Sequence, residues 1–198
     1  MTLDFDQSEY AMTTTGFLEN KLLLAMPTMG DQRFERSVIY MCSHDASGAM
    51  GLVVNQVIAH LSFEDLLEQL EIDVGTEALD IPVHAGGPVE PGRGFVLHSA
   101  DFVQDSTMIV SQTLALTATV DILKALADNT GPSRFVLALG YAGWGAGQLE
   151  REVQSNGWMI AEADDEILFN TEPDLMWPRA MAMLGIDIAM LSTEAGHS

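Results

Sequence analysis

A histidine, a serine and a carboxylate, the residue types of many hydrolases and transferases, occur close together at His98, Ser99 and Asp101. In such chemistry the histidine takes the serine hydroxyl proton, and the carboxylate orients the histidine. Adjacent residues on a strand point to opposite faces, however, and the chain contains no Gly-x-Ser-x-Gly sequence. The segment therefore favours a packed, hydrogen-bonded histidine, and an enzyme that uses His98, Ser99 and a carboxylate such as Glu150 is the alternative.

A second candidate is the glycine-rich segment 140–147, which contains four glycines between a predicted strand and a predicted helix. Glycine permits close backbone approach, and the unpaired N–H groups of a helix N-terminus attract anions. The spacing does not match the dinucleotide fingerprint, because Gln148 stands where its third glycine would be, and no Lys-Ser/Thr pair follows as in a phosphate-binding loop. The segment favours a tight turn that lets Trp144 pack, and an anion site is the alternative.

Metal chemistry has little support in the sequence. The five histidines show neither H-x-x-x-H nor H-x-H spacing, and Cys42 is the only cysteine. Because cysteine is among the most often buried residue types, Cys42 is predicted to be a small core residue, with a redox-sensitive thiol as the alternative. We expect neither a metal site nor a cofactor.

The chain is strongly acidic, with 29 Asp and Glu against 8 Lys and Arg and a formal net charge of −21. A field of that sign repels nucleic-acid phosphates, so direct nucleic-acid binding is not expected. Arg33, Arg36 and Arg93 stand beside turns, where they could form a local anion-attracting spot. Surface ion pairs with the abundant carboxylates are the alternative for these side chains.

The length of 198 residues fits one domain, which we place at 16–191 between flexible tails at 1–15 and 192–198. Met12 is a second candidate start of the chain. No apolar stretch approaches the ~20 residues of a membrane helix, and residues 1–15 lack the Lys and Arg of a signal peptide. A lone cysteine agrees with a reducing compartment. We therefore expect a cytoplasmic protein with no membrane partner.

Apolar patterning predicts the elements that position these residues. Apolar and β-branched runs bounded by turn residues predict strands over 22–26, 37–42, 50–54, 82–85, 94–98, 107–116, 134–139 and 158–161. Helical spacing and capping residues predict helices over 61–70, 120–129, 146–156 and 175–184. The acidic segments 73–80 and 162–166 are expected to be a loop and a solvated face. Because the strands come in runs instead of β-α-β alternation, the predicted fold class is α+β.

Several motifs follow one another in a fixed order: Ala-Met-Pro at 25–27, Arg-Ser-Val at 36–38, His44, Gly-Leu-Val-Val-Asn at 51–55, Gly-Gly-Pro-Val at 86–89, Gly-Phe-Val-Leu-His-Ser at 94–99 and the glycine-rich segment continued to Glu150. In this combination the chain resembles the YqgE/AlgH family of bacterial proteins over about 17–185. The resemblance implies a single α+β domain whose bent, branched, mixed β-sheet forms a barrel-like core with flanking helices.

The resemblance implies no established activity. Part of the family is labelled as transcriptional regulators, from a connection to alginate production, but the family has no recognised DNA-binding motif. What the resemblance does imply is a candidate ligand-binding surface, made by Asn55, Gly86, Gly87, Pro88, His98, Ser99, Tyr141, Gly143, Trp144, Gly145, Gly147, Gln148 and Glu150.

Our first hypothesis is a cytoplasmic regulator that binds a small ligand or a protein partner at this glycine-lined surface. A hydrolase-like or transferase-like enzyme that uses His98 and Ser99 is the alternative. A direct DNA-binding regulator ranks third, because the sequence contains no helix-turn-helix with a basic recognition helix. Both a monomer and a homodimer are compatible with the hydrophobic pattern.

Overall fold

The computed structural model describes residues 16–73 and 79–194. The predicted N-terminal tail, 1–15, lies outside the described residues, as do positions 74–78 of the predicted acidic loop. At the other end, helix α7 (Ile188–Glu194) continues past the predicted domain boundary at 191, and 195–198 lie outside the described part.

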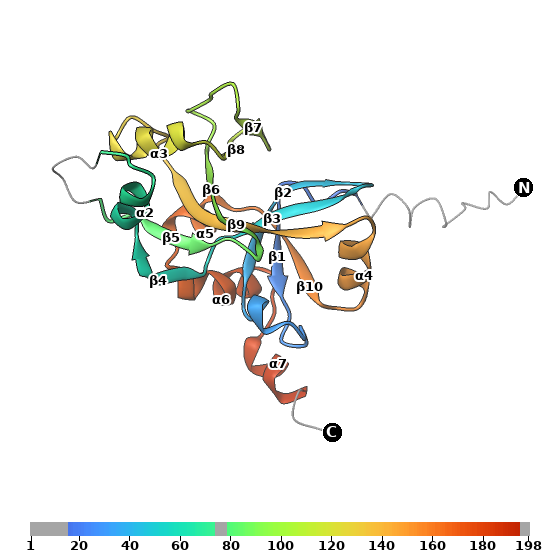
Figure 1. The fold of residues 1–198 in the computed structure, drawn as a ribbon. Helices are drawn as coiled ribbons and strands as arrows, with labels where there is room; N and C mark the ends of the chain where they lie inside the picture. Colours follow the sequence, from blue (N-terminus) through green and yellow to red (C-terminus); the bar gives the residue numbers. More distant parts are fainter. Residues whose placement is uncertain (1–15, 74–78, 195–198) are drawn as a thin grey trace, which may run out of the picture.

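A curled, branched sheet forms a half-barrel at the centre of the α+β fold, in agreement with the barrel-like core that the resemblance implies (Figure 1). Its main path runs β10-β1-β2-β3-β9-β6-β8-β7, and β5 joins β9 with β4 beside it. Only the pairing of β5 with β9 is parallel, which makes the described sheet mixed. The strands are β1 (Lys21–Ala25), β2 (Val38–Asp45), β3 (Gly48–Val53), β4 (Val57–Ser62), β5 (Pro82–Ala85), β6 (Val89–Ser99), β7 (Met108–Ile109), β8 (Leu114–Thr117), β9 (Phe135–Gly145) and β10 (Trp158–Glu162).

The sheet branches at β9, the long strand that crosses the whole molecule in Figure 1. Its first part pairs with β6 and β5, and its last residues, 142–145, pair with β3. Gly140 has φ +71° at this change of partner, a left-handed conformation that favours glycine. The segment 140–145 is therefore strand and not the predicted tight turn, because β3 and β6 offer its backbone partners from distant parts of the chain.

Helices cover both faces of the sheet, so β1 and β2 are buried on both sides. Leu22 and Leu24 lie in a core under α5 (Asp165–Asn170) and α6 (Pro173–Met183), and Leu23 and Ala25 lie in a second core with α4 (Gln148–Gln154). A third core lies under α2 (Phe63–Gln69) and α3 (Val120–Ala127). Burial on both faces explains why these strands read as continuous apolar runs.

Capping residues fix where several helices begin. Ser62 and Asp65 form a reciprocal capping box at α2, in agreement with the predicted helix over 61–70. The Asp164 carboxylate accepts a hydrogen bond from the Ile167 N–H at the start of α5, so the predicted solvated face 162–166 contains the beginning of a helix. The predicted strand 107–116 is a hairpin of two short strands, β7 and β8. No helix in the described part of the chain is long and apolar enough to span a membrane.

Candidate functional site

The turn that contains Gly86, Gly87 and Pro88 crosses β9 at very short range. A Cβ atom on Gly86 would overlap the carbonyl oxygen of Gly140, and one on Gly87 would overlap the carbonyl group of Tyr141. The N–H and C=O of Gly86 both form backbone hydrogen bonds, at 2.7 and 2.9 Å. Pro88 is exposed beside them. The crossing of two backbones is sufficient reason for glycine at both positions.

A shallow hollow of about 400 Å³ lies next to this crossing and is lined by residues of β2, β3, β6 and β9. Gly143 is exposed there, and Met50, Val89 and Tyr141 contribute apolar side chains around it. Asp45 is the one carboxylate among the residues that line it. The structure thus brings together part of the predicted surface. We define the glycine-lined face as Ser43, Asp45, Ser47, Gly48, Ala49, Met50, Val89, Tyr141, Gly143 and Trp144.

The indole of Trp144 lies in the core with α4 and is only 7% exposed. Its Nε1–H donates to Glu152 Oε2 at 2.9 Å, and the Nε1–H of Trp158 donates to the same oxygen at 2.8 Å. The two indole rings pack edge to face, with their centroids 5.9 Å apart. Trp144 therefore anchors α4 to the sheet. Sequence reasoning missed Glu152, since nothing distinguishes it from the other helix carboxylates.

Side chains of α4 form hydrogen bonds around the start of this helix. The Gln148 side chain accepts a hydrogen bond from the Gly145 N–H at 3.0 Å and donates one to Glu152 at 2.9 Å. Gly147, with φ +68°, is the N-cap residue. Glu150 adds a carboxylate in the first turn, where a bound anion would have to lie. The geometry therefore does not support the anion alternative for this segment.

Glu150 is bound by His44, which the predicted surface did not include. Nδ1 of His44 accepts a hydrogen bond from the Leu18 N–H at 2.9 Å, so Nε2 carries the proton and donates to Glu150 Oε1 at 3.0 Å. The pKa of Glu150 is lowered chiefly by a hydrogen bond from its own N–H, and His44 adds to the effect. This pair ties α4 to β2 and to the beginning of the described chain.

His98 is completely buried and hydrogen-bonded at both ring nitrogens. Nδ1 lies 2.8 Å from the carbonyl oxygen of Ser99, which can only accept, so Nδ1 carries the proton. Nε2 then accepts from the Thr117 hydroxyl at 2.8 Å, and this hydroxyl lies 2.8 Å from that of Thr107. Burial lowers the pKa of His98, in keeping with a neutral ring. The side chain holds the loop before β7 against the sheet.

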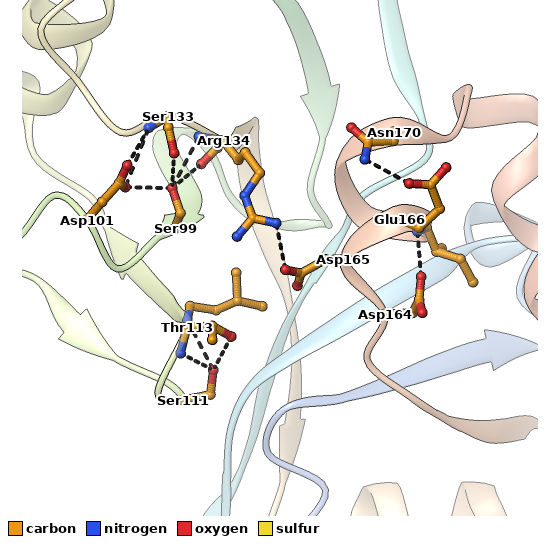
Figure 2. A network of polar contacts seen from close by, with 12 residues as sticks. Ser99, Asp101, Ser111, Thr113, Ser133, Arg134, Asp164, Asp165, Glu166 and Asn170 are labelled. Carbon is orange, nitrogen blue, oxygen red and sulfur yellow. Dashed lines mark hydrogen bonds and ion pairs between the residues drawn. The ribbon is translucent and has the colours of Figure 1, made fainter.

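Ser99 belongs to a separate network, which Figure 2 shows from close by. Its hydroxyl donates to Asp101 at 2.6 Å and accepts from the Arg134 N–H at 3.1 Å. Asp101 also accepts from the Ser133 N–H at 3.1 Å, and hydrogen bonds from Ser133 and Ser99 lower its pKa to about 2. The Arg134 guanidinium reaches Asp165 of α5 at 2.6 Å. The network joins β6, β9 and α5, and His98 is not part of it.

The structure does not bring the residues of the enzyme alternative together. Ser99 lies beside Arg134, immediately before β9, whereas Glu150 follows the other end of β9. Eleven extended residues at ~3.3 Å each separate these ends by roughly 30 Å. That is far beyond hydrogen-bond reach, so Ser99 and Glu150 do not share a catalytic site.

Asn55 uses both atoms of its amide to bind backbone. Its Oδ1 accepts from the Val38 N–H at 2.8 Å, and its Nδ2 donates to the carbonyl oxygen of Arg36 at 2.9 Å. Asn55 therefore fixes the segment between the 3₁₀ helix η1 (Gln32–Phe34) and β2, and it is not among the residues of the glycine-lined face.

The remaining candidates for reactive chemistry are buried. Cys42 is a core residue, as predicted, and burial raises the pKa of its thiol to about 12. His84 donates from Nδ1 to the Leu137 carbonyl oxygen at 3.0 Å, and burial lowers its pKa. Within 16–73 and 79–194, no group of three or more His, Cys, Asp and Glu side chains is arranged to hold a metal ion.

The scarce cations are mostly neutralised. Of the three that could attract an anion, Arg33 pairs with Asp31 at 2.6 Å and Arg93 with Glu90 at 3.6 Å, whereas Arg36 forms no ion pair within the described residues. Ion pairs of this kind leave no cluster of free positive charge for a phosphate backbone. The cations with a carboxylate partner are Lys21, Arg33, Arg93, Lys124, Arg134 and Arg179.

The branched half-barrel, in which the turn at Gly86 and Gly87 crosses β9, defines an α+β protein. The family model described as AlgH-like matches residues 22–189, and the chain belongs to this family. The resemblance seen in the sequence motifs is thereby confirmed. A UPF0301 protein of Methylobacterium nodulans is 52% identical over 92% of this chain and 90% of its own length. Another, from Bradyrhizobium diazoefficiens, is 50% identical over 94% of this chain and 91% of its own length.

Two solved structures share the fold. The solution structure of the AlgH protein from Pseudomonas aeruginosa superposes with a TM-score of 0.77 at 40% identity, covering 93% of this chain and 97% of that one. The crystal structure of a Corynebacterium diphtheriae protein gives a TM-score of 0.66 at 21% identity, covering 91% and 94%, which shows the fold alone. These similarities confirm the predicted fold class.

Proposed function

We propose that this protein is a cytoplasmic regulator that acts by binding a protein partner on the glycine-lined face. The observation that supports the proposal is the make-up of that face. Gly143 leaves backbone exposed, and Met50, Val89 and Tyr141 offer apolar contacts around it. An apolar side chain of a partner fits such a shallow hollow, because anchor residues in interfaces occupy pockets of this kind.

The state of the polar side chains supports binding over catalysis. His44, His98 and Ser99 each form hydrogen bonds that hold elements of the fold together. A general base or nucleophile needs a free path to a substrate, and these groups are 6% exposed or less. The net charge of −21 favours a partner whose rim is basic, since complementary charge accelerates encounter.

The experiment fills the hollow and compares the variant with a matched one elsewhere. Gly143→Lys places a long side chain in the hollow, and a Cβ at Gly143 has the Tyr141 ring as its nearest neighbour, at 3.2 Å. Val120→Lys adds the same side chain on α3, where Val120 is 43% exposed. We expect cross-linked complexes isolated from the source bacterium to disappear with Gly143→Lys and to persist with Val120→Lys. Equal complexes from both variants contradict the proposal.

A second readout addresses the regulatory role. A strain that carries Gly143→Lys should show the transcript changes of a strain that lacks the protein, and Val120→Lys should match the wild type. Urea unfolding of both purified variants verifies that each is folded. A folded Gly143→Lys variant that leaves the transcript profile unchanged rules out regulation through this face. A small ligand in place of a protein would appear as added mass in native mass spectrometry of wild-type protein, absent from Gly143→Lys.

A further inference from the structure

A second hollow, of about 350 Å³, lies between the segment that follows β1 and helices α6 and α7. It shares no residue with the glycine-lined face. Met26, Met29, Ile188 and Leu191 give it apolar walls, and the Trp177 ring lies beneath them, 2% exposed. The volume falls in the range of small-molecule sites, and methionine side chains adapt readily to different ligand shapes.

Arg36 lines this hollow, and its surroundings are unusual for a cation in such an acidic chain. Six of the eight Lys and Arg side chains have a carboxylate partner, but Arg36 forms no ion pair or side-chain hydrogen bond within the described residues. Its guanidinium lies over the Trp177 ring, 5.4 Å from the centroid. Arg151, which also lacks such a partner, is on α4, where its charge helps to lower the pKa of Glu150. Arg36 is therefore a cation that a ligand in this hollow can pair with.

The backbone around Arg36 is held in place. Arg36 has φ +52°, a left-handed conformation that costs a residue with a side chain ~1 kcal/mol or more. The amide of Asn55 stabilises it by donating to the Arg36 carbonyl oxygen at 2.9 Å. The Nε1–H of Trp177 donates to the Ala25 carbonyl oxygen at 2.9 Å, which fixes the ring below the guanidinium. The site is thus preorganised, which reduces the entropy lost on binding.

We propose that this hollow binds a small apolar monocarboxylate, a ligand separate from the partner of the glycine-lined face. A guanidinium binds a carboxylate through two parallel hydrogen bonds, and Arg36 has its donors free for them. The aliphatic or aromatic body of the ligand packs against Met26, Met29 and Ile188. Glu35 also lines the hollow, and its negative charge disfavours ligands with a second carboxylate or a phosphate.

The test titrates octanoate and phenylacetate into the full-length protein, with octanamide and phenylacetamide as neutral counterparts. The ¹³C-labelled ε-methyl groups of Met26 and Met29 report binding at the site. We expect at least one acid to bind at least tenfold more tightly than its amide. Arg36→Gln should weaken that binding at least tenfold, and Arg36→Lys, which keeps the charge but loses the paired donors, should lie between. Whichever acid binds identifies the aliphatic or aromatic class of the ligand.

Neighbouring side chains supply matched controls. Arg33→Gln removes a nearby cation that is already paired with Asp31 and should leave the affinity unchanged. Glu35→Gln removes the repelling carboxylate and should tighten binding severalfold. Unfolding midpoints of all variants separate lost binding from lost folding. Binding of neither acid, equal binding of acid and amide, or full binding by a folded Arg36→Gln protein would each overturn the proposal.

Discussion

Replacing Gly140 by alanine tests whether the glycines at the branch of the sheet serve the crossing of two backbones. The native φ of +71° costs a residue with a side chain ~1 kcal/mol. The added Cβ would also overlap the carbonyl oxygen of Gly87 and lie 2.9 Å from that of Val89. Both neighbours are backbone atoms, which cannot rotate away as a side chain can, so overpacking adds about 1–3 kcal/mol. Gly140→Ala should therefore lose about 2–4 kcal/mol of unfolding free energy.

Gly143→Ala is the matched control on the same strand. Gly143 has no left-handed φ, and its added Cβ would meet side-chain atoms, the edge of the Tyr141 ring at 3.2 Å and Val89 at 3.7 Å. Because alanine loses less backbone entropy on folding than glycine, this variant should remain within about 0.5–1 kcal/mol of the wild type. Urea unfolding followed by tryptophan fluorescence measures both free energies of unfolding. In thermal unfolding, the midpoint of the Gly140 variant should be roughly 4–16 °C lower than that of the wild type.

The reasoning is refuted by one particular result. If Gly140→Ala unfolds within about 0.5 kcal/mol of the wild type, the range of ordinary surface substitutions, the crossing does not require glycine. The glycines would then need another explanation, such as a ligand that contacts the backbone directly. Equal losses for Gly140→Ala and Gly143→Ala would also contradict the argument, because Gly140 combines a left-handed φ with backbone neighbours and Gly143 has neither.

Three further predictions concern buried groups. Cys42 should react with iodoacetamide at pH 8 only as fast as the protein unfolds, because burial raises its pKa to about 12; rapid labelling of folded protein would contradict this. His98 has a pKa lowered by burial, so its contribution to stability is present above pH 6.5 and is lost as the pH falls below that value; a urea midpoint as high at pH 5 as at pH 7.5 would count against it. Glu152→Ala should cost about 2–4 kcal/mol, because it leaves the buried indole N–H groups of Trp144 and Trp158 without an acceptor, and Glu152→Gln, measured beside it by urea unfolding, should cost less.

The elements that could be predicted from the sequence are those whose side chains are buried on a regular pattern. β1 and β2 are buried on both faces and appear in the sequence as apolar runs. The Ser62 and Asp65 capping box predicts the start of α2. β4 was missed because it is an edge strand with mostly exposed side chains and only two paired positions. α5 was missed because the carboxylates that cap and begin it, from Asp164 onward, resemble a solvated loop when no tertiary contact is known.

The glycine-rich motif could be recognised in the sequence, but the structural reason for its glycines could not be predicted. A glycine that lets a ligand approach the backbone and one that lets another strand cross it look identical, since both need only the absence of a Cβ. The backbone that crosses Gly140 is the turn at Gly86 and Gly87, and no local pattern predicts contacts so distant along the chain. Of the predicted surface, the structure brings Tyr141, Gly143 and Trp144 together at one hollow.

The pairing of the arginines is another feature that the sequence alone does not predict. The sequence shows that cations are few, and it places Arg33 and Arg36 in one turn, so both appear equally available. The structure distinguishes them. Arg33 pairs with Asp31 two residues away, whereas the Asn55 amide binds the Arg36 carbonyl oxygen and the Arg36 guanidinium lies over Trp177. Arg36 forms no ion pair within the described residues, although the chain has 29 carboxylates, so its guanidinium retains its capacity to bind an anion. In the proposed carboxylate site Asn55 is a positioning residue for Arg36, and Asn55→Ala should weaken carboxylate binding less than Arg36→Gln does.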